Sequence, residues 1–83
     1  MHEIEIVKEL IQELESQAKN QKANKLTKVV IGISSNEHII PESFQFWFDE
    51  LSKGSIVEGT KLEFQTQEKE GVCIKSIELE TDE

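Results

Sequence analysis

The sequence lacks arginine and tyrosine and has one cysteine, one proline and one tryptophan among its 83 residues. Without arginine, the chain lacks the side chain that binds phosphate through two parallel hydrogen bonds. Its 17 acidic and 9 basic residues give a net charge of -8, so no basic patch for a nucleic acid or an anionic membrane is expected. One cysteine excludes an intramolecular disulfide and a zinc site built from several cysteines. The composition therefore argues against nucleic-acid and membrane partners and favours a reducing, cytoplasmic compartment.

The length allows one small domain, and we expect a single domain over residues 1–83. A domain of this size buries only about 60% of the surface of its unfolded chain, so its core is small and its stability marginal. No apolar run approaches the roughly 20 residues of a membrane span, and no signal peptide is recognisable.

Apolar residues at helical spacing predict a first helix over residues 3–22. The stripe consists of Ile4, Val7, Ile11, Leu14 and Ala18. A β-branched run then predicts a strand over residues 26–34, in which Leu26 and Val30 face away from Val29.

A second helix is predicted to begin at Pro41, because proline suits the first helical position. The residues Phe44, Trp47, Phe48 and Leu51 share one face of it. Ile40 is expected to pack back against that face, and Gly54 to end the helix.

Two further strands are predicted over residues 61–66 and 72–79. The polar turn at 67–71 between them is short enough for an antiparallel hairpin. The alternation of the last strand changes phase, which indicates a bulge near Lys75 and Ser76 or a strand covered on both faces.

The predicted order is α-β-α-β-β, an α/β (α+β) fold with a three-stranded mixed sheet carrying two helices. The β-α-β portion over residues 26–66 is expected to make its two strands parallel. With both helices on one face, the other face stays partly open, and Leu26 and Val30 are expected there. Exposed apolar patches usually mean association, so a homo-oligomer is also expected.

Catalytic signals are weak, and we expect that the protein is not an enzyme. The four glycines are scattered, so there is no phosphate-binding loop. Cys73 paired with His38 stays open as a nucleophile and base, but a cysteine within an alternating strand is ordinarily a small buried hydrophobe. His38 is expected to be an exposed loop residue.

The position of His2 is more informative. A histidine next to a free amino terminus offers the α-amino group, its own amide and its imidazole, and the amide of Glu3 could add another nitrogen. Consecutive donors of this kind form small fused chelate rings, and deprotonated amides suit square-planar Ni(II) or Cu(II). By itself this signal is weak, because many chains carry a histidine near the start.

Five segments, taken together and in this order, carry a resemblance to a known family: 1–3 (Met-His-Glu), 28–33, 40–48, 54–64 and 74–80. They cover nearly the whole chain, which resembles the nickel-binding domain of the HypA family of hydrogenase and urease nickel-maturation chaperones. The family carries a zinc domain with two C-x-x-C pairs between its last two strands. Here only the short turn at 67–71 occupies that place, so the zinc module is expected to be absent and no zinc to be bound.

The resemblance implies Ni(II) at the amino terminus, bound by the imidazole of His2 and by main-chain nitrogens of Met1, His2 and Glu3. It also implies that the same end docks to the family's GTPase partner and that nickel passes to a nickel-enzyme precursor. An alternative is a zinc-less protein-interaction module of the same fold in which metal binding is lost or incidental.

Overall fold

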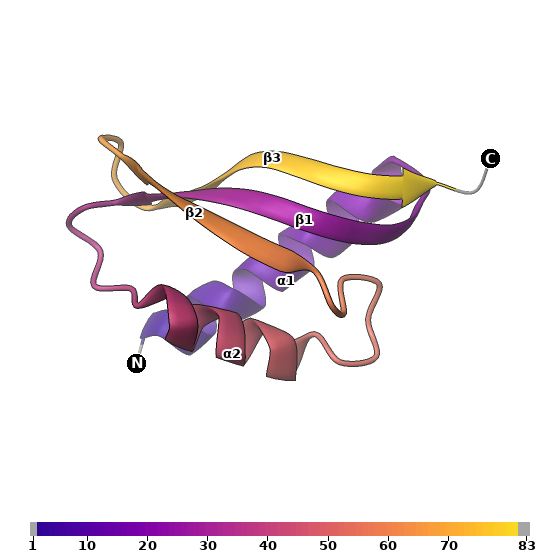
Figure 1. Ribbon diagram of the computed structural model, residues 1–83, viewed down its shortest axis with the longest axis horizontal. Coiled ribbons are helices and arrows are strands. Elements are labelled where there is room, and N and C mark those ends of the chain that lie inside the picture. The colour runs from indigo at the N-terminus through magenta and orange to yellow at the C-terminus, as the bar shows by residue number, and fades with distance from the viewer. Residues whose placement is uncertain (1, 82–83) are drawn as a thin grey trace.

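The computed structural model describes residues 2–81, and of His2 only the main chain. The chain forms two helices and three strands in the predicted order (Figure 1). These elements are α1 (His2–Asn20), β1 (Ala23–Ser34), α2 (Pro41–Leu51), β2 (Lys61–Gln67) and β3 (Val72–Thr81). The α+β class is confirmed. The bounds differ from the predicted ones by a few residues, because element ends depend on capping and pairing more than on periodicity.

β1 is the central strand of the sheet, whose order is β2-β1-β3. It pairs in parallel with β2, as the crossover predicted, and antiparallel with β3. The predicted hairpin is wrong, because β2 and β3 lie on opposite sides of β1. Strand length gives a physical reason: β1 has 12 residues and matches the 10 of β3, whereas β2 has only 7. Pairing with β1 also sets Val29 opposite Ile77 and Ile31 opposite Ile74, and such apolar cross-strand pairs stabilise a sheet.

Two irregularities in β1 turn its apolar side chains onto one face. The register against β3 shifts between Ala23 and Lys25 and again between Leu26 and Lys28. An extra residue at each place reverses the alternation, so Leu26 is fully buried on the same side as Val29. The expected exposure of Leu26 is therefore wrong, and one of the two residues that suggested self-association is lost. Self-association itself stays a prediction.

A third irregularity lies in β3. Val30 pairs with Ser76 and Ile31 with Ile74, so Lys75 is the extra residue. The predicted bulge is confirmed, and it brings the apolar side chains of both halves of β3 against the core. These partly buried residues are Val72, Ile74, Ile77 and Leu79.

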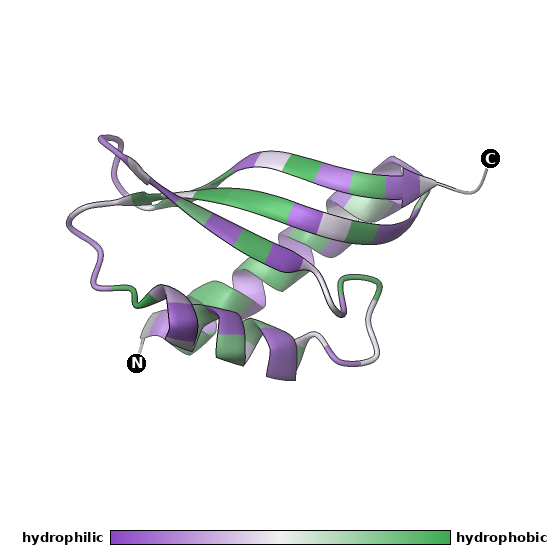
Figure 2. Cartoon of the chain, viewed as in Figure 1, coloured by the Kyte–Doolittle hydropathy of each residue, from purple (hydrophilic) through white to green (hydrophobic). Residues whose placement is uncertain are grey.

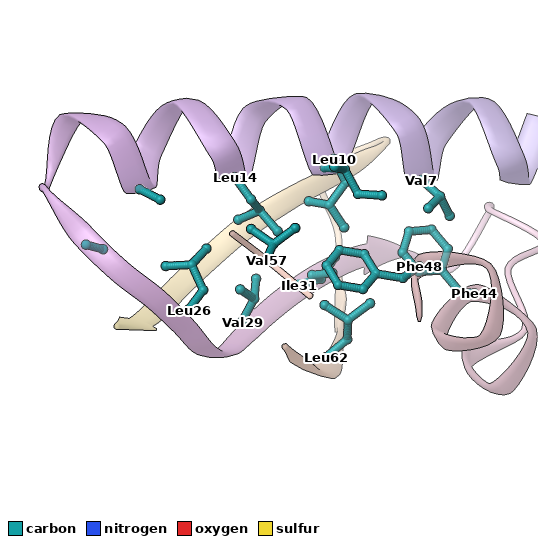
Figure 3. Packing of buried hydrophobic residues seen from close by; sticks show 13 residues of the cluster. Val7, Leu10, Leu14, Leu26, Val29, Ile31, Phe44, Phe48, Val57 and Leu62 are labelled. Atoms are coloured by element: carbon teal, nitrogen blue, oxygen red, sulfur yellow. The ribbon is translucent and has the colours of Figure 1, made fainter. Parts of the chain in front are cut away.

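Both helices cover the same face of the sheet, and the core lies between them and β1 (Figure 3). The predicted inner stripe of α1 is confirmed for its buried members, which are Val7, Ile11, Leu14 and Ala18. Phe44 and Phe48 of α2 are fully buried, and the ring of Phe44 meets that of Phe64 edge to face at 5.6 Å between centroids. The core therefore fixes α2 against both α1 and β2.

The outer surface of α2 carries apolar residues that the core does not take up. Ile40 is 62% exposed, Phe46 54% and Leu51 37%. The expected packing of Ile40 against the helix is therefore wrong, and its neighbour Ile39 packs against the core instead. The helix ends at Leu51, earlier than the predicted stop at Gly54, and the following residues form a series of turns.

Replacing Ser52 with alanine is expected to raise the free energy of unfolding by up to about 1 kcal/mol. The hydroxyl of Ser52 is buried and has no hydrogen-bond partner among the described residues, so its loss of hydration is uncompensated. Urea unfolding followed by circular dichroism measures the change. The matched control is Ser55→Ala, which removes a hydroxyl that donates to the Ser52 carbonyl at 2.7 Å and should lower stability. A lower stability of the Ser52 variant would contradict the prediction.

The strands alternate hydrophilic and hydrophobic residues (Figure 2). Because the hydrophobic residues pack against the core on the side of the helices, the hydrophilic ones lie mainly on the opposite face. Lys28 donates to Glu63 there at 3.1 Å. The hydrogen bond and the charge of Glu63 raise the pKa of Lys28 above its ordinary value. Because this pKa is higher in the folded protein, the pair stabilises the fold below the ordinary lysine pKa, and this contribution is lost as the pH rises through the folded value.

Candidate metal centre

The first turn of α1 lies beside the beginning of α2 (Figure 1). Glu3 is half-buried in this turn, and one of its carboxylate oxygens accepts a hydrogen bond of 2.8 Å from the hydroxyl of Ser43. Ser43 is the third residue of α2, and the neighbouring Phe44 is fully buried in the core. The carboxylate of Glu3 therefore ties the start of α1 to a helix whose position the core fixes.

The three residues predicted as nickel ligands differ in how far the structure describes them. Met1 lies outside the described residues, and for His2 only the main chain is described, as the first residue of α1. Glu3 is fully described. The first four N–H groups of an α-helix have no acceptor within the helix. The amides of His2 and Glu3 belong to that group, so the loss of their protons to a metal would take no hydrogen-bond donor away from the helix.

The described part of the chain offers no second metal site made of side chains. No group of three or more histidine, cysteine, aspartate or glutamate side chains in that part could hold a metal ion. His38 lies in the loop before α2 and is exposed, as predicted. No described side-chain cluster thus competes with the amino terminus as a candidate metal centre.

Cys73 is half-buried, but it lies on the polar face of the sheet, opposite Gly32 of β1, and not in the core. Its thiol donates to the side-chain carbonyl of Gln67 at 2.9 Å. The side chains of Gln67 and Lys75 cross over Gly32 and occupy the space that a larger residue there would need. The expectation of a buried core cysteine is therefore wrong, and the thiol is held by polar neighbours.

A groove of about 640 Å³ runs between α1 and the beginning of β3. Apolar Ile6 and Leu10 line it together with the carboxylates of Glu9 and Glu13, and Cys73 borders it. His38 is not among the lining residues, so the groove does not unite the pair that the sequence left open as nucleophile and base. None of the described helices is long and apolar enough to cross a membrane.

Known proteins are similar to this chain over nearly its whole length. The sequence model of the family described as "Hydrogenase/urease nickel incorporation, metallochaperone, hypA" matches residues 1–81. The chain is a member of the HypA family. The resemblance deduced from five segments is confirmed. The family's description is that of a metal carrier and not of a catalyst, in agreement with the expectation that the protein is not an enzyme.

Curated HypA proteins are similar over most of this chain. The hydrogenase maturation factor HypA of Caldanaerobacter subterraneus subsp. tengcongensis is 33% identical over 73 residues, which are 88% of this chain and 64% of that protein. The HypA of Dechloromonas aromatica is 30% identical over 78 residues, or 94% of this chain and 69% of that protein. The match spans only 64% of the length of the Caldanaerobacter protein and 66% of the length of HypA proteins from two strains of Acidithiobacillus ferrooxidans.

The fold also matches a solved HypA structure. The solution structure of the nickel metallochaperone HypA from Helicobacter pylori superposes with a TM-score of 0.76 at 20% identity, covering 99% of this chain and 100% of that chain. At this identity the match establishes the HypA fold alone. Sequence reasoning about that fold missed Ser43 as a neighbour of Glu3, because the two residues are 40 positions apart and no local pattern joins them.

Proposed function

We propose that this HypA protein is a nickel metallochaperone that binds Ni(II) at its amino terminus and passes it to the precursor of a hydrogenase or urease. The ligands are the imidazole of His2 and the main-chain nitrogens of Met1, His2 and Glu3. The observation that carries the proposal is the family match, which begins at residue 1 and so includes all three residues. The proposal places the protein in the cytoplasm.

The chemistry of the first helical turn supports nickel at this end. Nitrogen donors in a plane suit d⁸ Ni(II), and amides become strong donors when they lose their protons. The positive end of the helix dipole repels a cation, but Glu3 and Glu5 in the first turn and the two ionised amides offset it. Binding that releases protons depends on pH and is reversible, as a carrier requires.

We further propose that this chain works as a single domain over residues 1–83 without the family's zinc module. The connection between β2 and β3 comprises residues 68–71 only, within the predicted turn at 67–71. Cys73, the single cysteine, follows it within β3, so two C-x-x-C pairs have no counterpart there.

Partners form the next part of the proposal. A GTPase of nickel maturation docks at the amino-terminal end, and an enzyme precursor receives the metal. The exposed apolar residues of α2, a helix that packs beside the first turn of α1, support a protein contact near the metal. The same residues favour a second candidate function, a protein-interaction module of this fold with metal binding lost or incidental.

Nickel titration of protein with a free, native amino terminus tests the proposal. The wild-type protein should develop the absorbance of square-planar Ni(II). The change His2→Ala should lower the association constant by more than about 100-fold, since even the loss of an outer-sphere partner costs a metal site 10- to 100-fold.

The other histidine of the chain provides a matched control. His38 is exposed in a loop, so His38→Ala should bind nickel like the wild type. Equally weak binding by all three proteins would reject the metallochaperone and favour the interaction module. Equal losses in both variants would instead reject the assignment of His2.

A further inference from the structure

Ser43 makes the side-chain contact that fixes the first turn of α1. Its hydroxyl donates to Glu3 at 2.8 Å in a partly buried position. Among the described residues, no other side-chain hydrogen bond or ion pair joins α1 to a different element. Apolar side chains also pack α1 against the core: Ile6 is partly buried there, and Val7, one turn after Glu3, is the first that is fully buried.

The helix that carries Ser43, α2, is anchored in the core. Ser43 is followed by Phe44, which is fully buried, and Phe48 is buried one turn later. A free helix end frays, because its first turn has few hydrogen bonds to hold it. The contact with Ser43 therefore holds residue 3 in place where the helix alone would not.

Nickel chelation requires a backbone conformation in this turn that differs from the helical one. Two consecutive main-chain nitrogens close a small chelate ring on one ion only when the backbone between them is nearly planar and eclipsed. In an α-helix the corresponding torsion ψ is about -42°. Loading therefore has to rotate the backbone before Glu3, while the residues after it stay helical and packed.

We propose that Ser43 is a positioning residue of the nickel site. By holding the Glu3 carboxylate against α2, it fixes the last chelating nitrogen while the preceding backbone rotates into the chelating conformation. Without this contact the rotation spreads into the first turn of α1. Nickel binding then has to order that turn as well, and the entropy lost in doing so lowers the affinity. This inference rests on the proposed function, because it takes Glu3 as the end of the ligand set.

The first experiment compares nickel binding by Ser43→Ala, Ser43→Thr and the wild type. The alanine variant should lower the association constant by about 3- to 10-fold, which matches the net contribution of one hydrogen bond. The threonine variant keeps the hydroxyl and should restore binding. The matched control is Ser55→Ala, which also loses a partly buried hydroxyl donor but lies after α2, and should bind nickel normally.

Two further variants separate positioning from charge and from general stability. Glu3→Gln keeps an oxygen that accepts from Ser43 and should retain most of the affinity, whereas a purely electrostatic role of Glu3 would lose it. One glycine added before Met1 places His2 third, so the new amino group, two amides and the imidazole complete a square plane without the amide of Glu3. In that extended protein Ser43→Ala should leave nickel affinity unchanged.

Hydrogen exchange without metal provides an independent test of the contact. The amides of residues 6–8 should exchange about 3- to 10-fold faster in Ser43→Ala than in the wild type. Unchanged exchange, or unchanged nickel affinity while His2→Ala abolishes binding, would overturn the role of Ser43 and leave the proposed function standing. An absence of nickel binding by the wild type would overturn both.

Discussion

Selective acetylation of the α-amino group of Met1 is expected to abolish square-planar nickel binding, although His2 remains intact. The acetyl group converts a free amine into an amide whose lone pair is delocalised and which binds only after losing a proton. The association constant should fall by at least about 100-fold, as for His2→Ala. The same titration measures this change, and a circular dichroism spectrum verifies that the fold is retained.

The result separates a chelate at the chain terminus from a site built on the imidazole alone. Binding by the acetylated protein that equals the wild type would contradict the proposed ligand set. Addition of a single glycine is the informative control, because the amino group is displaced but a new chelate ending at the imidazole of His2 becomes available. Nickel binding should therefore survive the glycine and disappear on acetylation.

Replacing Phe44 with alanine is expected to lower the free energy of unfolding by about 3 to 5 kcal/mol. The side chain is fully buried, and its ring packs edge to face on Phe64 of β2. Domains are stable by roughly 0.05–0.15 kcal/mol per residue, so this loss is a large part of the total for a chain of this length. Chemical unfolding followed by tryptophan fluorescence measures it, since Trp47 lies in the same helix.

The same helix supplies the control. Phe46 is two residues away and 54% exposed, so Phe46→Ala should change stability by only about 0.5 kcal/mol. Losses of similar size in both variants would show that the rings do not differ in burial as the structure indicates. The Phe44 variant should also weaken nickel binding, because Ser43 would no longer be held on a fixed helix.

Local periodicity was sufficient for much of the fold. The spacing of Val7, Ile11 and Leu14 predicted the buried face of α1, and Pro41 predicted the start of α2. The change of phase in β3 predicted the bulge that the structure has at Lys75. Each of these features depends on residues within a few positions of one another, which is the range over which side-chain alternation acts.

Predictions that required choosing among distant partners were less successful. A short turn suggested a hairpin of β2 with β3, but the longer β1 offers β3 more apolar cross-strand pairs. The two bulges of β1 are likewise set by pairing with β3, so the burial of Leu26 could not be read from alternation. The position of Cys73 also depends on pairing with a distant strand, since its register opposite Gly32 of β1 puts it on the polar face.

For the candidate site, the sequence by itself determined the chemistry. His2 next to an amino terminus offers a set of nitrogens suited to square-planar nickel, and the proposed ligand set rests on this arrangement. Only the tertiary structure decided that Ser43 binds Glu3, because this contact depends on how α1 and α2 pack on the sheet. Ligand identity follows from neighbouring atoms in the chain, whereas the support of a ligand follows from the free energy of packing distant segments together.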